Sequence, residues 1–388
     1  MKKLFLLLLV VLIGISNVFA SNLHFVFGDM AQHPDILYGF FPSYALLGVG
    51  YELPEIIEGN NTELRVLVGE GYSQRLMWLD EESGKNNFDD GSWESRDALR
   101  FNVWINELSL RFLQGFFKSP VENKDLLTLT LFLNGRYEKY NSGSSFGPFN
   151  IKGNLTSIVS DDYNKKIYPE LNGKDKALLG LELALSLKLD LMEDTLHTND
   201  GLWARVDYKL GPKSLNSTLS GYSDYSSLTF NVVGAKTLYE LKKENKSMFS
   251  ISLVDRFNFN YTTGSAVPSY VIGPVSLGRK VRGFNTYTYQ TEFTTVNNLD
   301  LRFVGPDVGM DKVAPRLNLF VDVGYGWGNV FNTSRSEENF LASVGAQLEM
   351  SFFDFIDLGY EVNYLLVDRE KYTQSGRITT NVTFFLDF

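Results

Sequence analysis

Hydrophobic and polar residues alternate one by one along much of this chain. From Leu179 to Leu191 all seven odd-numbered positions are leucine, while the even-numbered positions carry glycine, glutamate, alanine, serine, lysine and aspartate. A helix would spread these leucines around its whole circumference, whereas an extended strand places them on one face. Similar alternation recurs at 127–133, 202–210 and 356–364. The pattern predicts amphipathic β-strands.

The second face of these strands decides the kind of β-fold. Polar side chains occupy it in strand after strand, which indicates a wet or charged interior and favours a barrel over a sandwich with two dry inner faces. Transmembrane strands need only ~9–11 residues and alternate in this way. We therefore expect an all-β fold, a transmembrane antiparallel β-barrel of about 16 strands. The expected strands are 23–29, 43–53, 63–79, 97–117, 126–141, 148–159, 178–191, 201–211, 226–240, 247–261, 267–275, 292–304, 316–327, 339–351, 355–367 and 377–388.

The first twenty residues have the pattern of an export signal. Lys2 and Lys3 precede an apolar run that ends at Ile15, and the segment ending at Ala20 offers a cleavage site. The run is short for a membrane-spanning helix of ~20 residues, which favours a cleaved signal peptide. A retained membrane anchor is the alternative. We expect a signal peptide at 1–20 and one outer-membrane β-barrel domain at 21–388.

Charge and composition exclude several classes of protein. Without Lys2 and Lys3 the chain has 36 − 2 = 34 basic and 46 acidic residues, a net charge of −12, which argues against nucleic acid as a partner. There is no cysteine, so disulfides and thiolate metal sites are excluded. The three histidines, His24, His33 and His197, lie far apart in the sequence. We expect no metal site and no cofactor.

One arginine and one carboxylate form a candidate site. Arg282 lies beside Gly283 in an expected outer loop, and the strand 316–327 follows it. In that strand the odd-numbered residues are apolar, so Asp322 lies on the less apolar face. We expect Arg282 to fold into the lumen of the barrel and to form a buried pair with Asp322.

From about residue 178 onward the chain resembles the barrel of the bacterial surface antigen superfamily. This group includes BamA- and TamA-like assembly factors and the TpsB-type transporters of two-partner secretion. The matching segments are Val281-Arg282-Gly283-Phe284, then Asn298-Leu-Asp-Leu-Arg-Phe303, then Phe320-Val-Asp-Val-Gly324, and the terminal Phe388.

The resemblance implies roles for single residues. In the family the loop enters the lumen, five strands follow it, and its arginine meets acidic residues on the next two strands. Arg282 would therefore pair with Asp322 and with Asp300, while Gly283 would allow a tight turn and Phe284 would lie in the lumen with Val281. The alternation also places Asp300 opposite a lipid-facing row of leucines.

The end of the chain resembles the signal by which outer-membrane barrels are recognised for insertion. Phe384, Leu386 and Phe388 share one face of the last expected strand. Two departures from the family stand beside this. Arg279 follows Leu277-Gly278 where the family usually has paired glycines, and the strands start almost at the mature N-terminus, which leaves no room for a periplasmic polypeptide-transport-associated (POTRA) domain.

Two functions remain open at this stage. The resemblance implies protein insertion into, or translocation across, the outer membrane. The partners would be outer-membrane lipid, unfolded outer-membrane or secreted proteins, and a separate periplasmic chain. The alternative is a passive or plugged pore, or a structural barrel without transport or assembly activity. The inward charges Glu182, Lys188, Arg205, Asp207 and Glu361 fit a channel lining or a closed polar interior equally well.

A hydrolase is the third class. It would need a serine–histidine pair at the lipid-facing surface. His197 lies in an expected outer loop beside Thr198, with no serine in a recognisable frame. We therefore expect no enzymatic activity.

Overall fold

A computed structural model gives the structure of the protein. It describes residues 23–27, 31–32, 42–76, 100–119, 124–141, 143–146, 149–152, 169, 177–194, 199–213, 223–244, 246–284, 289–308, 313–352, 356–367 and 377–386. The expected signal peptide at 1–20 and the terminal Phe388 lie outside these residues.

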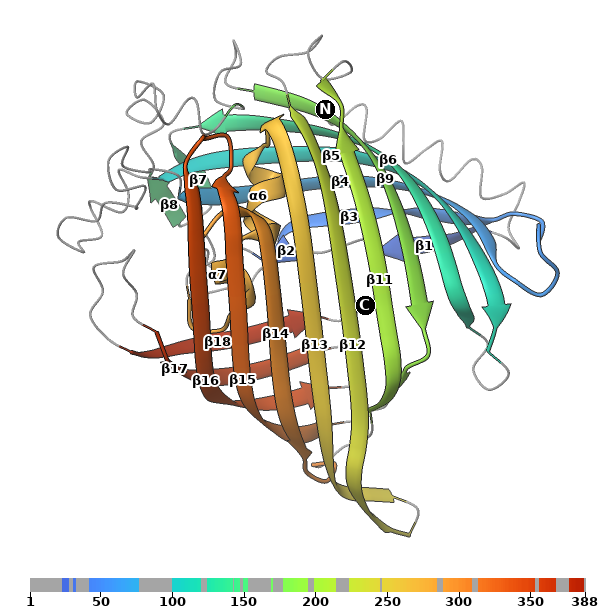
Figure 1. Ribbon diagram of the computed structural model, residues 1–388. Coiled ribbons are helices and arrows are strands. Elements are labelled where there is room, and N and C mark those ends of the chain that lie inside the picture. The colour runs from blue at the N-terminus through green and yellow to red at the C-terminus, as the bar shows by residue number, and fades with distance from the viewer. Residues whose placement is uncertain are drawn as a thin grey trace.

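One antiparallel sheet makes up most of the fold and curves into the wall of a barrel (Figure 1). Each strand pairs with the next strand of the wall along the chain. The two ends of this order, β1 and β18, do not pair with each other within the described residues. The fourteen strands are β1 (Leu23–Phe27), β3 (Pro42–Glu52), β4 (Thr62–Leu76), β5 (Arg100–Lys118), β6 (Asp125–Asn141), β9 (Ala177–Asp190), β11 (Asn199–Gly211), β12 (Asp224–Lys243), β13 (Lys246–Ala266), β14 (Thr291–Val304), β15 (Val313–Val330), β16 (Ser336–Phe352), β17 (Ile356–Leu365) and β18 (Ile378–Leu386).

Four short strands lie off this order. β2 (Ala31–Gln32) pairs with β3, and β10 (Glu193–Asp194) pairs with β11. β7 (Gly143–Phe146) and β8 (Phe149–Lys152) form a separate two-stranded hairpin. The connection between β6 and β9 carries this hairpin outside the wall.

The antiparallel barrel is confirmed, but two of the expected strands are wrong. The described part of the segment 148–159, residues 149–152, belongs to β8 and is no part of the wall, because β6 pairs directly with β9. The segment 267–275 contains a helix, α6 (Ser269–Val275), instead of a strand. Its apolar residues are buried in the lumen and do not face lipid, and sequence alternation cannot distinguish the two kinds of burial.

The two errors also reversed the expected direction of every strand between them. Connections at one end of the barrel are 28–41, 77–99, 142–176, 212–223, 267–290, 331–335 and 366–377. We call this the long-loop end. At the other end, the short-turn end, they are 53–61, 119–124, 191–198, 244–245, 305–312 and 353–355. The connection that holds His197 is therefore on the short-turn side, although His197 itself lies outside the described residues.

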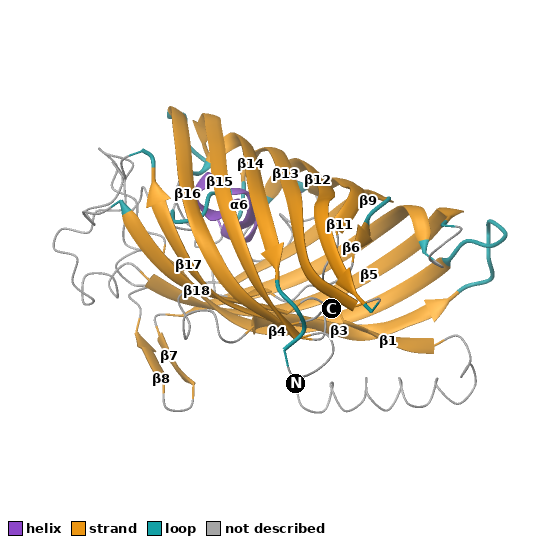
Figure 2. Cartoon of the chain, turned by 90° about the horizontal axis from the view of Figure 1, so that it is seen from below, coloured by secondary structure: helices purple, strands orange, loops and turns teal. Residues whose placement is uncertain are grey.

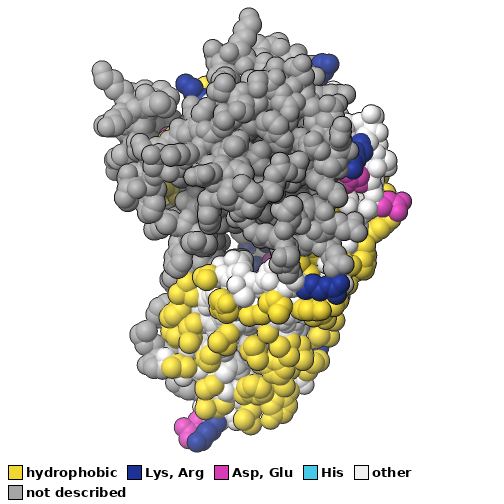
Figure 3. Space-filling model, turned by 90° about the vertical axis from the view of Figure 1, so that its left-hand side faces the viewer, with side chains coloured by type: hydrophobic (Ala, Val, Ile, Leu, Met, Phe, Trp, Pro, Cys, Tyr) yellow, Lys and Arg dark blue, Asp and Glu magenta, His cyan; other side chains and the backbone are white. Residues whose placement is uncertain are grey.

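The wall is apolar outside and polar inside, as the alternation predicts. On β9 the leucines at 183, 185 and 187 are each more than 40% exposed, while the alternate residues Glu182 and Ser186 are buried. The inward charges are bonded to one another or to polar neighbours, as in the pair of Arg205 and Asp207 at 2.8 Å. In Figure 3 hydrophobic side chains cover one side of the wall and charged groups gather at its lower tip and upper border.

Aromatic side chains mark two levels on the outer face. At the long-loop end Phe293 stacks on Tyr261 at 4.3 Å and on Trp327 at 5.1 Å between ring centroids. At the short-turn end Phe249 contacts Tyr239 and Phe303, each at 6.4 Å. From 293 to 303 β14 rises by about 33 Å along its own axis. With a tilt of about 40°, this leaves roughly 25 Å between the levels, the height of the apolar band of a transmembrane β-barrel.

The described residues also include two short helices. α6 has seven residues, and α7 (Leu277–Lys280) has four. Among the described residues no helix is long and apolar enough to cross a membrane.

Candidate functional site

The described residues of the connection between β13 and β14 (267–290) lie inside the curve of the sheet (Figure 2). We call it the lumen loop. It contains α6 and α7, and five strands, β14 to β18, follow it. An outer loop folded into the lumen is thus confirmed. Leu277, Val281 and Tyr289 of the loop form an apolar cluster with Val296 and Leu341 of the wall, so the loop has an apolar contact surface as well as polar anchors.

The loop enters the lumen through a backbone clamp. The side chain of Asn332 accepts a hydrogen bond from the backbone N–H of Val267 at 2.7 Å and donates one to its carbonyl at 2.8 Å. Asn332 itself has a φ of 60°, in the turn between β15 and β16. The Asn332 side chain therefore provides hydrogen-bond partners for the N–H and the carbonyl of Val267, directly after the end of β13.

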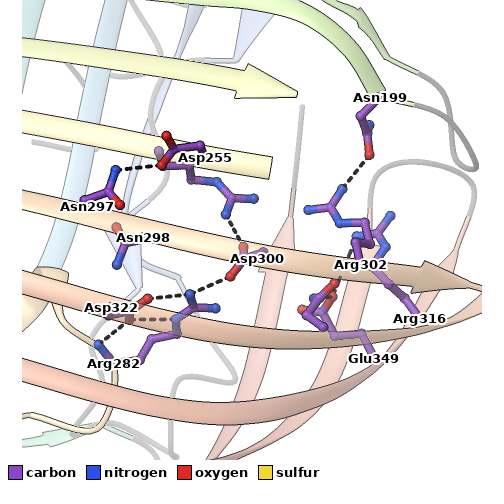
Figure 4. Close-up of polar contacts among 12 residues, drawn as sticks. Asn199, Asp255, Arg282, Asn297, Asn298, Asp300, Arg302, Arg316, Asp322 and Glu349 are labelled. Atoms are coloured by element: carbon purple, nitrogen blue, oxygen red, sulfur yellow. Dashed lines mark hydrogen bonds and ion pairs between the residues drawn. The ribbon is translucent and has the colours of Figure 1, made fainter. Parts of the chain in front are cut away.

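Arg282 forms the central polar contact of the loop (Figure 4). Its Nε donates to Asp322 Oδ2 at 2.8 Å and its Nη2 donates to Asp322 Oδ1 at 2.6 Å, which is a bidentate pair. Its backbone N–H also donates to Asp322 Oδ2, at 2.9 Å. Nη2 donates to Asp300 Oδ1 at 2.6 Å as well. We call Arg282 with these two carboxylates the latch.

The charges of the latch are balanced on the wall. Asp300 also accepts a hydrogen bond from Arg256 of β13, so two arginines face two aspartates. Burial acts to lower the pKa of Arg282, but the hydrogen bond and charge of Asp322, and then the charge of Asp300, outweigh it and raise that pKa above its ordinary value. Arg282 is therefore charged at any pH that the protein tolerates.

An aromatic ring stacks against the guanidinium of Arg282. The Cζ atom of Arg282 lies 3.6 Å from the ring centroid of Phe320, a cation–π contact in a site shielded from water. Gly345, the cross-strand neighbour of Phe320, makes room for the ring, because a Cβ at this position would lie 2.5 Å from its Cζ. Charge pairing and ring stacking thus fix both the ends and the plane of the guanidinium.

Glycine residues of the wall and of the loop allow close contact around α7. A Cβ on Gly324 would lie 2.7 Å from Val281 Cγ2 and 2.8 Å from Leu277 Cδ1. Gly283 has a φ of 85°, which favours glycine, and a Cβ there would collide with Asn363 of β17. The loop therefore makes close contacts with the wall on both sides of Arg282.

A further anchor lies on the opposite wall and was missed by sequence reasoning. The guanidinium of Arg136, on β6, lies 4.8 Å from the ring centroid of Tyr270 in α6. Tyr225 of β12 meets the same ring edge-on at 6.5 Å. Burial and the charge of Glu182 raise the pKa of Tyr270, so its hydroxyl stays protonated. The one available signal was Gly180, an inward glycine next to the Tyr270 hydroxyl.

The other residues singled out from the sequence are placed as follows. Val281 is buried, and the ring of Phe284 meets Tyr289 edge-on at 6.4 Å within the lumen. Phe384 and Leu386 lie in β18, paired through their backbones with Leu358 and Ile356. Their role in insertion stays a prediction. Among the described residues no group of three or more histidines or acidic side chains is placed to hold a metal ion.

No protein-family model matches the sequence, and the search of curated proteins found no match. Solved structures with a similar fold include BamA from Haemophilus ducreyi lacking POTRA domains 1–3, with 12% identity and a TM-score of 0.49 over 88% of this chain and 62% of that one. CdiB from Acinetobacter baumannii has 12% identity and a TM-score of 0.43 over 88% of this chain and 50% of its own. CdiB from Escherichia coli has 9% identity and a TM-score of 0.45, over 89% and 54%. The chain thus spans 50% to 62% of the length of these structures.

Proposed function

We propose that the protein is an outer-membrane barrel that acts in protein insertion or translocation, and that its lumen loop is a plug held by the latch. The observation that carries this proposal is the contact of Arg282 with Asp322. Three hydrogen bonds join these two residues, and each can be exchanged reversibly for a hydrogen bond to water. Release of this pair removes the central polar contact of the loop and leaves the contacts of Asn332 and Tyr270 as its further anchors.

The strength of the latch suits a gate. Removing one partner of a buried ion pair costs about 3–5 kcal/mol, which corresponds to a change of roughly two to four orders of magnitude in an equilibrium. A protein substrate that engages the barrel could supply that much binding energy. We infer outer-membrane lipid and unfolded outer-membrane or secreted proteins as partners, with a separate periplasmic chain to deliver them, and no catalytic activity.

The alternative is a barrel whose plug never leaves. The contacts of Asn332 and Tyr270 favour it, because they hold the loop at two further places on the wall. In that case Arg282 stabilises the barrel and has no part in gating.

Conductance of the protein in lipid vesicles separates these functions. We would compare the wild type with Arg282→Ala and with Arg279→Ala, a control in the same loop whose side chain is exposed. A gated plug predicts a closed wild type, an open Arg282→Ala variant and a closed control. If all three conduct alike, the latch idea fails and a passive pore is favoured. If none conducts and Arg282→Ala is only less heat-stable, the plug is permanent.

A second assay tests the insertion role itself. Vesicles that contain the protein should fold an added, unfolded outer-membrane barrel faster than empty vesicles of the same lipid. Arg282→Ala should change that rate, whereas Arg279→Ala should not. Equal rates with wild-type and empty vesicles would contradict insertion activity, even if the conductance results favour a gate.

A further inference from the structure

The outer face of the wall carries a charged residue at the middle of its apolar band. Asp255 lies on β13, six residues from Phe249 and six from Tyr261, which belong to the two aromatic levels. Its side chain is exposed, and its outward neighbours Leu253 and Phe257 are exposed apolar residues. Because hydrocarbon solvates charge poorly, an ionisable residue at this depth is costly and marks a contact site.

A polar side chain of the neighbouring strand contacts Asp255. Asn297 of β14 donates from Nδ2 to Asp255 Oδ1 at 2.6 Å (Figure 4). One amide hydrogen bond does not compensate a carboxylate charge in an apolar surrounding. The complement of this surface is therefore a cation held at nearly the same depth in the membrane.

The same surface also offers such a cation. Lys236 of β12 faces outward, with 73% of its side chain exposed. It is the cross-strand partner of Leu253, while Gly234 is the partner of Asp255, so the two charges lie on adjacent strands two residues apart in height. Nζ contacts Asp200 Oδ1 at 2.6 Å, which uses one of the three donors of an ammonium group.

We propose that a second copy of this chain covers this surface and forms a two-fold dimer within the membrane. A two-fold axis along the membrane normal keeps the depth of every residue. Lys236 of each copy then faces Asp255 of the other, the reciprocal arrangement of an isologous interface. The height offset is about 6–7 Å along the strand, less after tilt, which the four-carbon stem of a lysine covers.

The surface between the two charges permits close approach. A Cβ on Gly234 would meet nothing within 4 Å, so the outer face is open where the strand partner of Asp255 lies. The contact is independent of the lumen loop, because these side chains point away from the lumen. A dimer is therefore compatible with either of the functions considered above.

A single introduced cysteine tests the dimer, because the natural chain has none. Leu253 is the strand partner of Lys236 and lies two residues from Asp255, close to the proposed axis. Leu253→Cys should therefore form a disulfide between copies under mild oxidation in lipid vesicles at low protein density. Leu185→Cys is the matched control, an equally exposed leucine on the outer face of β9. We expect disulfide-linked dimers with Leu253→Cys at several times the yield of the control. Equal yields, or none with Leu253→Cys, overturn the proposal.

The charges are tested in the Leu253→Cys background. Asp255→Leu suits a lipid-facing position, so it should fold, and it should lower the dimer yield by about tenfold. Lys236→Met should do the same, and the double variant should fall no further than either single one, because the two residues form one contact. If Asp255→Leu raises heat stability and leaves the dimer yield unchanged, Asp255 faces lipid and no dimer contact exists.

Discussion

The close contact between α7 and the wall can be blocked without changing the residues of the latch. Gly324→Ala leaves Arg282, Asp300 and Asp322 in place but adds a methyl group where the loop contacts the wall. That carbon would lie 2.7 Å from Val281 and 2.8 Å from Leu277, both closer than real Cβ contacts allow. We expect this change to displace the lumen loop.

The size of the effect of Gly324→Ala follows from the cost of adding atoms to a well-packed interior. An extra methylene in a well-filled core costs typically about 1–3 kcal/mol. Each 1.4 kcal/mol is a factor of about ten, so the population of the displaced loop should rise roughly 5- to 100-fold. The barrel itself should keep its fold, because Gly324 forms ordinary backbone pairs with β14 and β16.

A thiol reporter measures that population. Ser276, between α6 and α7, is fully buried, and Ser276→Cys provides the single cysteine of the chain. Its rate of labelling by a membrane-impermeant maleimide reports how often the loop leaves the wall. Gly273→Ala, in the same loop, is the matched control, since a Cβ there meets nothing within 4 Å.

Two outcomes decide the matter. If Gly324→Ala labels no faster than Gly273→Ala, the close contact between α7 and β15 does not hold the loop, and the reasoning is refuted. If it labels faster, Val281→Ala in the same chain should slow the labelling again, because it removes the nearer of the two colliding groups. A general loss of stability would not be rescued by a second truncation.

Three further changes test other parts of the loop. Tyr270→Ala should speed Ser276→Cys labelling by at least about tenfold, since truncating a buried aromatic residue costs ~3–5 kcal/mol; Tyr270→Phe, which keeps the ring near Arg136, should change it much less, and equal effects would contradict the ring contact. Asn332→Ala should lower the melting temperature measured by tryptophan fluorescence, because two backbone groups lose a partner at about 1–3 kcal/mol; an unchanged value would contradict the clamp. Burial, and then the charge of Arg279, lowers the pKa of Lys280 to about 8 in the docked loop. Between about pH 8 and 10.5 the docked loop therefore binds fewer protons than the displaced loop. Docking of the loop should strengthen as pH rises through that window. Conductance of Arg282→Ala should fall there by at most about tenfold per pH unit, and Lys280→Met should remove the dependence.

The strands of the wall were predictable because alternation is local. A strand such as 179–191 shows its two faces in its own sequence, whatever it pairs with. The segment 267–275 misled the same reasoning, because Val271, Ile272 and Val275 are buried against other side chains inside the barrel. Burial in a lumen and burial in lipid both select apolar residues. Only the pairing of β13 with β14 excludes the extra strand, and pairing is not local.

The latch was predictable for a different reason. Arg282 and Asp322 combine a motif with an inward position, so two independent patterns indicate the same pair. Tyr270 has neither, because its contact Arg136 lies more than a hundred residues away in sequence and belongs to no motif. Asp255 was present in the alternation as a charge on an apolar face, but its meaning depends on the depth of the aromatic rings.

The sharing of Asp300 has an electrical consequence. When the loop leaves, Asp300 keeps Arg256, but Asp322 loses all three hydrogen bonds that it accepts from Arg282. Glu361, buried nearby with the neutral Asn363 as its hydrogen-bond partner, adds a second acidic group. If the lumen loop is the plug proposed above, Arg282 is the counter-ion of these lumen carboxylates, and we expect the opened lumen to favour cations. A soluble guanidinium compound should block that current by taking the place of the missing side chain.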